Sequence, residues 1–259
     1  MAGFVCIYYG NTGSSWLMDS LGASPQVLLP GYEPLEGWSW DVAPDAKLEW
    51  LRNALKPPAE REGPIYDAWV EKLHDSPQVK DLPNKPDFVH VGFKMNNLAV
   101  RAPGGVASAL ADAGAKAIIL TRENRIKHAL SLYRYHEEKK SQFSGGEGLG
   151  PTTVNLRLFR KWVGQSVSFH KHVMRVRDAL VDRIGEDNIF DVAYEDFVTE
   201  EGKEDTIEKL GAFLDIEVAA KKFSVYKKAT PDDLRSAVRN YNRLRLRYVF
   251  SPLRQYFRE

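Results

Sequence analysis

Four short apolar runs, separated by helical patterns, constrain the fold of this chain most. Each run is rich in Val, Ile, Phe or Tyr and predicts a β-strand: Phe4–Tyr9, Phe88–Met95, Ala115–Thr121 and Asn188–Tyr194. The third run is apolar on both faces, as a central parallel strand is. Strands that alternate with helices predict a three-layer α/β/α fold with a central parallel sheet and a P-loop-like nucleotide-binding core.

Helical patterns fill the segments between these strands. We expect helices over Ser14–Leu21, Gly105–Ala113, Asn124–Lys139 and Thr153–Ile184, the last broken near Gly164. Residues Asp232–Tyr248 predict one further helix, a basic one, with arginines at positions 235, 239, 243, 245 and 247. A solvated face is the ordinary interpretation of such a run. We expect residues 1–259 to form a single domain with ligands at the carboxyl ends of its strands.

Residues 23–87 differ in composition from the rest of the chain. They hold Trp38, Trp40, Trp50 and Trp69 among many prolines and glycines, with only brief helical patches. They form either a surface insertion packed by its own aromatics or an acceptor-side lid. A glycine-rich break over residues 141–150 is either a linker or a flap.

Charge and cysteine content exclude several classes of protein. The net charge is +1, so no global basic field suggests nucleic acid as a partner. The one cysteine, Cys6, excludes a disulfide framework and a cysteine-rich zinc site, and we expect it to be buried in a strand. No apolar run approaches the ~20 residues of a membrane span, and the chain begins without a signal peptide, so we expect no transmembrane segment and a cytoplasmic protein.

The chain that follows the first predicted strand has the properties of an anion site. A glycine loop, Gly10–Gly13, leads into a helix that begins with Ser14 and Ser15. Unpaired N–H groups and the helix dipole favour an anion there, and Thr12 and the two serines add hydroxyl donors. A plain turn with a serine N-cap explains the same residues. Ser14 stands where a triphosphate P-loop has lysine, which favours a ligand without a γ-phosphate or an obligatory metal.

Two further pieces lie at the ends of later strands. Arg122 follows the third strand and Ser131 lies nine residues on, so an arginine fork and a hydroxyl could hold a second phosphate. A surface arginine and a helical serine are the alternative. The fourth strand runs into Tyr194-Glu195-Asp196, where the tyrosine could touch an adenine edge or simply end the strand.

Together these pieces resemble sulfotransferases that use 3′-phosphoadenosine 5′-phosphosulfate (PAPS), most closely the bacterial and carbohydrate-type branch. The N-terminal loop resembles that family's 5′-phosphosulfate loop, and Arg122 with Ser131 resembles its 3′-phosphate site. Tyr194-Glu195-Asp196 and Arg239-Asn240-Tyr241 are similar to motifs of the family's later core strand and C-terminal helix. The resemblance covers most of the chain in order, but residues 23–87 match nothing in the family.

The resemblance implies a transferase that moves the sulfuryl group of PAPS to a hydroxyl of a carbohydrate, a glycolipid or a small alcohol or phenol. In-line attack releases 3′-phosphoadenosine 5′-phosphate (PAP), and no metal is needed. The partner is then a small-molecule or glycan acceptor, and a homodimer is left open. The expected nucleotide-binding residues are Asn11, Thr12, Gly13, Ser14, Ser15, Trp16, Arg122, Ser131 and Tyr194.

The sequence departs from the family at Asn11, where a lysine or arginine usually neutralises the leaving oxygen. Asparagine donates a hydrogen bond but brings no charge. Lys94, at the end of the second predicted strand, could reach the same point, although a surface lysine is an equal interpretation. A general base must also take the acceptor's proton. The candidates are Glu33, Glu36 and His90, and we favour Glu33 because a histidine inside a strand is more often a core residue; His128, His136, His170 and His172 lie on predicted helices and are expected to face solvent.

Two other functions stay open. A small-molecule kinase or another P-loop phosphotransferase would need the Gly-Lys-Ser/Thr step and a metal-binding Asp after a strand, and the chain has Thr121-Arg122 after its third strand. A protein that binds the nucleotide without turnover is the second alternative, and Asn11 is the argument for it.

Overall fold

The computed structural model describes residues 3–29, 33, 35, 43–56, 90–138, 150–218 and 233–257. The chain divides into two compact units, each described here by itself. The first comprises Met1–Tyr9, Gly13–Thr121 and His172–Ser224, and the second comprises Gly10–Thr12, Arg122–Lys171 and Val225–Glu259. The prediction of a single domain stays a prediction.

The first unit is built on a five-stranded parallel sheet. Its strands are β1 (Phe4–Ile7), β2 (Val27–Leu28), β3 (His90–Met95), β4 (Lys116–Thr121) and β5 (Ile189–Ala193), in the order β2-β3-β1-β4-β5. All four predicted strands are confirmed. The sequence analysis missed β2, because two residues carry no periodic signal. Cys6 is fully buried in β1 as expected, and burial raises the pKa of its thiol to about 12.

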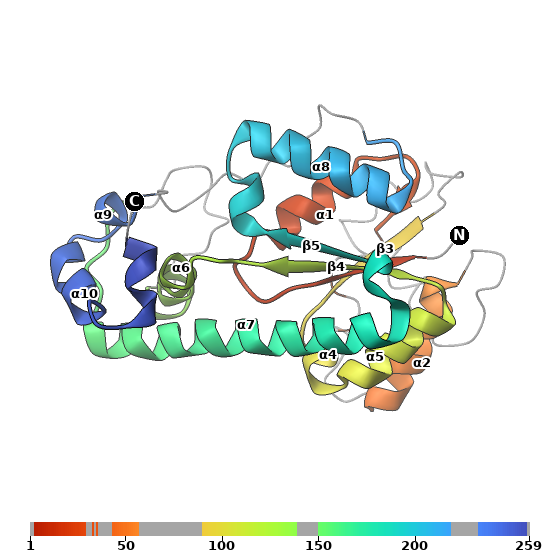
Figure 1. Cartoon of the computed structure of the whole chain (residues 1–259), viewed down its shortest axis with the longest axis horizontal. Coiled ribbons are helices and arrows are strands. Elements are labelled where there is room, and N and C mark those ends of the chain that lie inside the picture. Colours follow the sequence, from red (N-terminus) through yellow and green to blue (C-terminus); the bar gives the residue numbers. More distant parts are fainter. Residues whose placement is uncertain are drawn as a thin grey trace. The chain divides into compact units, whose positions relative to one another are not determined.

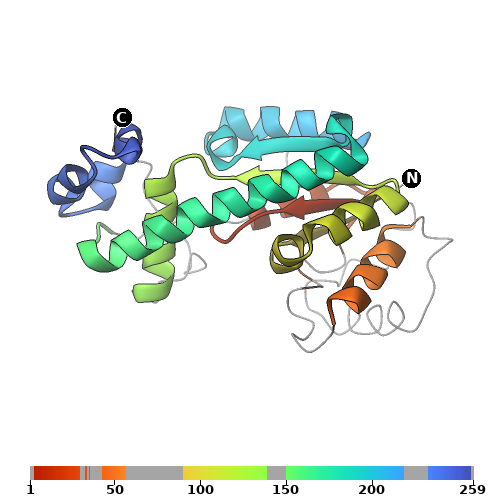
Figure 2. The ribbon, with the colours of Figure 1, turned by 60° about the horizontal axis from the view of Figure 1, so that its bottom comes forward.

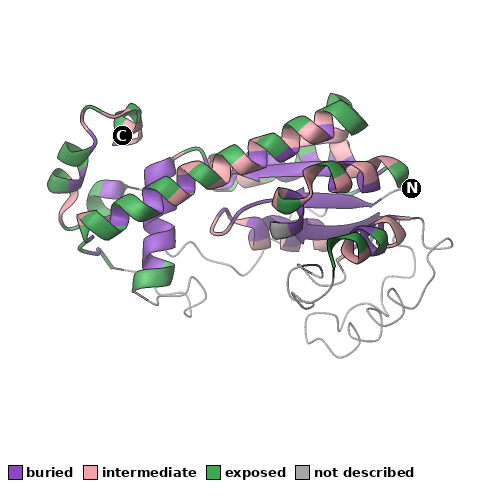
Figure 3. Cartoon of the chain, turned by 90° about the horizontal axis from the view of Figure 1, so that it is seen from below, coloured by how far each residue is buried: buried purple, intermediate pink, exposed green. Residues whose placement is uncertain are grey.

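Helices cover both faces of this sheet (Figures 1 and 2). On one face lie α1 (Ser14–Gly22) and α8 (Glu200–Leu214), and on the other lie α5 (Pro103–Asp112) and its neighbour α2 (Pro44–Leu55), with the short α4 (Asn97–Arg101) before α5. The strands are buried along nearly their whole length, as Figure 3 shows. The three-layer α/β/α fold with a central parallel sheet is therefore confirmed.

The strand order places a binding crevice at a definite point. From β1 the chain leaves toward β2 on one side, and from β4 it leaves toward β5 on the other. The strand order thus reverses between β1 and β4, and open parallel sheets bind ligands outside the carboxyl ends of the strands at such a point. The loops that follow Ile7 and Thr121 are the two that leave this point.

Residues 23–87 hold more regular structure than predicted. Helix α2 has twelve residues, and Trp50 within it is almost fully buried, with its ring 5.3 Å from that of Phe93 in β3. Trp50 therefore packs on the sheet rather than in a separate surface insertion. Trp38, Trp40 and Trp69 lie outside the described residues, as does most of the glycine-rich break.

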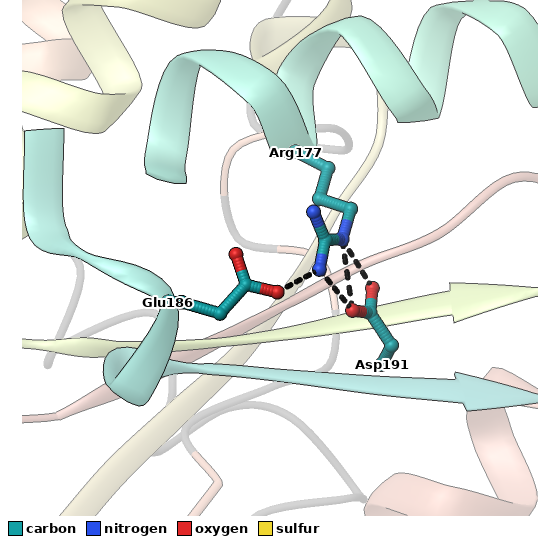
Figure 4. Close-up of polar contacts among 3 residues, drawn as sticks. All are labelled: Arg177, Glu186 and Asp191. Atoms are coloured by element: carbon teal, nitrogen blue, oxygen red, sulfur yellow. Dashed lines mark hydrogen bonds and ion pairs between the residues drawn. The ribbon is translucent and has the colours of Figure 1, made fainter. Parts of the chain in front are cut away.

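Helix α7 (Leu156–Ile184) is one continuous helix, so the break predicted near Gly164 is wrong. Its inward side continues through this position, because Trp162, Val163 and Ser166 are all buried. Toward its end, Arg177 holds the helix against the rest of the first unit. Its guanidinium donates to both carboxylate oxygens of Asp191 in β5 and to Glu186 in the 3₁₀ helix η4 (Glu186–Asn188), as Figure 4 shows.

The second unit has a core of its own around α6 (Arg125–Glu137). The start of α7, together with α9 (Leu234–Ala237), α10 (Tyr241–Arg247) and the 3₁₀ helix η6 (Pro252–Phe257), completes it. The single basic helix predicted over Asp232–Tyr248 is wrong. Val238 pairs with Thr152 in a parallel bridge, and the Asn240 side chain exchanges two hydrogen bonds with the backbone of Val154. These partners are worth more to the backbone here than continuation of the helix.

Candidate functional site

The loop after β1 ends in a helix N-terminus that is built for an anion. Gly13 caps α1 in the left-handed conformation, at φ 81°, and the first turn of the helix carries no acidic residue. A Cβ atom at position 13 would lie 2.9 Å from the Phe197 ring and 3.0 Å from the Tyr194 ring. Only glycine fits both the backbone angle and the space. The free N–H groups of α1 therefore begin at a point that the sequence cannot easily change.

A buried lysine lies at this helix start. Lys94 of β3 has its Nζ 3.2 Å from Ser15 Oγ and 3.1 Å from Glu33 Oε1, with only 5% of its side chain exposed. The Tyr8 hydroxyl at the end of β1 donates to the same carboxylate, and Lys94 Nζ lies 5.1 Å from the centre of the Tyr8 ring. We call Tyr8, Ser15, Glu33 and Lys94 the lysine cluster. It joins a cation, a carboxylate and two hydroxyls at the carboxyl ends of β1 and β3.

The cluster answers the question raised by Asn11. The sequence analysis named Lys94 as a second route to the missing charge, and the structure places its ammonium beside Ser15 of the loop. Glu33 lies beside it, so two of the expected catalytic residues meet. Tyr8 was missed, because an apolar run hides it. The signal that could have found it is a tyrosine at the carboxyl end of a predicted central strand.

Aromatic side chains of the 3₁₀ helix η5 (Tyr194–Phe197) border the loop in the same unit. The Trp16 ring stacks on Phe197 with centroids 4.8 Å apart, and Tyr194 meets Phe197 edge-on at 5.5 Å. Tyr194 thus lies next to Gly13, as its assignment to the nucleotide site requires. Ser14 and Trp16 are themselves buried.

In the second unit, two side chains hold the first residues of the loop. Arg122 Nη1 donates to the Asn11 carbonyl at 3.0 Å, and His128 Nε2 lies 2.8 Å from the Gly10 carbonyl. A carbonyl only accepts, so Nε2 carries the imidazole proton and Nδ1 accepts from the Ser166 hydroxyl at 2.7 Å. This loop conformation includes a left-handed Asn11, at φ 65°.

His128 is fully buried, so its predicted exposure to solvent is wrong. Burial, and then the positive charge of Arg122, lower the pKa of His128 from 6.5 to about 3. The imidazole is therefore neutral at physiological pH and serves as a fixed donor to the loop. The buried side of α6 includes Arg125, His128 and Leu132. Helical spacing around Arg125 could have found this histidine. His136 is exposed as expected, whereas His170 and His172 are half-buried.

Arg122 and Ser131, the expected 3′-phosphate pair, both belong to the second unit and are both buried. The Arg125 guanidinium donates to the Arg122 carbonyl, so two arginines lie at the start of α6. Thr12 in the loop is fully buried as well. Cations buried near a helix start favour an anionic ligand.

Two of the predicted bases are not brought to the lysine cluster. His90 begins β3, four residues before Lys94, which is about 13 Å along a strand. Glu36 lies outside the described residues. Within the described ranges, no three His, Cys, Asp or Glu side chains gather as a metal site, and no helix there is long and apolar enough to cross a membrane.

Comparison with known proteins returns similar folds only. No family model matches the chain, and no curated protein matches it significantly. Among solved structures, a sulfotransferase from Alicyclobacillus acidocaldarius is 16% identical with a TM-score of 0.48, over 99% of this chain and 94% of the other. The sulfotransferase domain from the curacin biosynthetic pathway is 14% identical with a TM-score of 0.46, over 86% and 79%.

Mouse sulfotransferase SULT7A1, in complex with PAP, is 14% identical with a TM-score of 0.42. The match covers 84% of this chain but only 60% of the mouse protein. A likeness of this size carries no argument about activity. The solved structures to which the chain is similar are nevertheless sulfotransferases, the family that its sequence motifs resemble.

Proposed function

We propose that the chain is a sulfotransferase that transfers the sulfuryl group of PAPS to an acceptor hydroxyl. The observation that carries the proposal is the buried ammonium of Lys94 beside Ser15, where α1 begins. It supplies the positive charge that Asn11 lacks. A helix N-terminus, hydroxyls and a buried cation together suit the 5′-phosphosulfate of the donor.

Each expected residue then has a part in binding the nucleotide. The N–H groups and hydroxyls of Thr12, Gly13, Ser14 and Ser15 bind the 5′-phosphosulfate, with Asn11 and Lys94 at the oxygen that bridges phosphorus and sulfur. Arg122 and Ser131 bind the 3′-phosphate. Trp16 and Tyr194 border the adenine.

The transfer step follows from these positions. The acceptor oxygen forms a bond to sulfur while the bond from sulfur to the bridging phosphate oxygen breaks. The electron pair stays on the phosphate of PAP, where Lys94 stabilises the charge. The acceptor proton passes to Glu33, which lies within reach of the same lysine. The acceptor is a carbohydrate, a glycolipid or a small alcohol or phenol, and a homodimer stays a prediction.

Titration calorimetry with PAP and with AMP, without metal, tests the donor site, because the two ligands differ only in the 3′-phosphate. We expect Ser131→Ala to weaken PAP roughly tenfold and to leave AMP unchanged, since one hydrogen bond to a charged group contributes about 1.5 kcal/mol. Lys94→Met should weaken both ligands by tenfold or more, because both carry the 5′-phosphate. Lys116→Met is the matched control, since this lysine begins β4 at the amino edge of the same sheet.

Arg122 needs a separate comparison, because it also holds the Asn11 carbonyl. Loss of PAP affinity alone in Arg122→Lys supports a 3′-phosphate contact, whereas equal loss of AMP affinity means that only the loop has moved. No PAP binding by the folded protein, or a preference for ATP with Mg²⁺, would contradict the proposal and favour the kinase. Tight PAP binding without release of PAP from PAPS, across sugar and phenol acceptors, would favour a nucleotide-binding protein without turnover.

A further inference from the structure

The C-terminal residues 233–257 carry a cationic surface that the proposed function does not use. We call its exposed side chains the arginine surface. They comprise Arg235, Arg239, Arg243, Arg245, Leu246, Arg247, Phe250 and Arg254. Asp233 is the only acidic residue in this range. Much of the ribbon near the C-terminus is accordingly exposed (Figure 3).

The fold of the second unit produces this arrangement. Leu244 and Tyr248 are one turn apart and both buried, so they define the inner side of α10. Leu246 is two residues from each, about 200° around the helix from Leu244, which directs it away from the core. Arg243 and Arg245 flank it. The outer side of α10 therefore presents an apolar side chain between cations.

Two large apolar side chains of this surface are left in solvent. Leu246 is 72% exposed, and Phe250, three residues beyond the end of α10, is fully exposed. Single exposed apolar residues are ordinary on protein surfaces. An exposed leucine and phenylalanine four residues apart among arginines form a different pattern, that of segments that lie in a membrane interface.

We propose that the arginine surface binds the surface of an anionic lipid bilayer. The guanidinium groups pair with lipid phosphates, and Leu246 and Phe250 enter the boundary between headgroups and acyl chains. Neither signal suffices alone, because basic residues give a reversible, salt-sensitive attraction and two apolar side chains bury little area. Their combination on one short segment is what a peripheral attachment needs.

Charge and chemistry favour this occupant over two others. A second copy of the chain, meeting the same surface by two-fold symmetry, would place arginines opposite arginines. A nucleic acid would pair with the arginines and stack on Phe250, but it offers nothing for the aliphatic Leu246. A bilayer surface accommodates all three kinds of contact. The proposal does not depend on the sulfotransferase activity.

Sedimentation with lipid vesicles tests it, with vesicles of phosphatidylcholine alone and of phosphatidylcholine with phosphatidylglycerol. We expect the protein to bind the anionic vesicles and to be released by salt. The triple variant R243Q/R245Q/R247Q should lose roughly a hundredfold in partitioning, since each arginine near such a surface contributes close to a factor of five. The variant L246S/F250S should lose the binding that survives in high salt.

Matched controls come from α7 in the same unit. R157Q/R160Q removes two exposed arginines, and L158S removes an exposed leucine; both should bind like the wild type. Circular dichroism and thermal unfolding verify that every variant is folded, as expected for changes at exposed positions.

Three results would overturn the proposal. The first is no binding of the folded wild type to anionic vesicles, or equal loss in the α7 controls. The second is binding of a duplex or single-stranded oligonucleotide that the triple variant abolishes, without vesicle binding. The third is a dimer, measured by light scattering, that L246S/F250S converts to a monomer, because the apolar pair would then belong to an interface between copies.

Discussion

Asn11 and Lys94 show how a change at one residue can be explained by the geometry at another. The resemblance implies a basic residue at position 11, whereas this chain has asparagine in the left-handed conformation, at φ 65°. Asparagine tolerates this conformation better than lysine does. The charge comes instead from Lys94 on β3, whose Nζ reaches Ser15 at the other end of the loop.

The backbone at Asn11 makes a prediction about stability. Asn11→Ala should lower the free energy of unfolding by about 1 kcal/mol, because a Cβ without a compensating side chain is strained at positive φ. Asn11→Gly should lower it less, since glycine adopts this angle freely. Urea unfolding of the three proteins measures the difference. A glycine variant less stable than the alanine variant would show that the Asn11 side chain, and not the backbone, decides the residue.

Buried His128 predicts a dependence of stability on pH. Its pKa is about 3 in the folded chain against 6.5 in the unfolded chain, so only the unfolded chain takes up this proton as the pH falls below 6.5. Uptake by the unfolded state favours unfolding. The stabilisation is complete above pH 6.5, and about 2 kcal/mol of it should be lost at pH 5.

Urea unfolding at pH 7 and pH 5 checks this prediction, with His128→Asn compared with the wild type. We expect the variant to be less stable at pH 7 but to lose about 2 kcal/mol less between the two values. His136→Asn, at an exposed position of the same helix, is the matched control. An equal loss in the wild type and in His128→Asn would mean that the imidazole already binds a proton in the folded state.

Among the elements, α7 and β5 are joined by the Arg177 interaction of Figure 4. The Arg177 side chain is 19% exposed, while Asp191 and Glu186 are about half exposed, at 48% and 62%. The hydrogen bonds from Asp191, and then those from Glu186, raise the pKa of Arg177. Because its partners are solvated, the pair contributes far less than a buried one.

Arg177→Gln should therefore destabilise the chain by only about 1 kcal/mol, at the upper end for an exposed pair because the contact with Asp191 is bidentate. The difference should shrink in high salt, since solvated charges are screened. Arg183→Gln, at an exposed position of the same helix, is the control and should change the unfolding free energy by less than about 0.5 kcal/mol. A salt-independent loss well above 1 kcal/mol would show that packing of the arginine stem dominates.

At the scale of the whole molecule, charge is distributed unevenly. A net charge of +1 conceals buried cations at the carboxyl ends of β1, β3 and β4 and an arginine-rich C-terminal segment. The overall charge correctly argued against a global basic field. It gave no information on local anion sites, because these depend on where acidic and basic residues are placed and not on their sum.

The sequence by itself determined the sheet and the loop. Apolar runs of strand length, separated by helical patterns, specify a buried parallel sheet, because only such a sheet is apolar on both faces of its central strands. Gly13 with Ser14 indicated the helix start, since few residues suit a left-handed cap. Arg122 and Lys94 could be named because both stand at the ends of recognisable strands.

Only the tertiary structure decided which of these residues meet. Strand order is not written in local periodicity, so the sequence could not show that β1 lies between β3 and β4, which brings Lys94 to Ser15. Burial of His128 depends on Gly10 and Ser166, distant in the chain. The same holds for the C-terminal helix: Val238 leaves it for Thr152 because a partner from elsewhere in the chain outweighs a local propensity of well under 1 kcal/mol per residue.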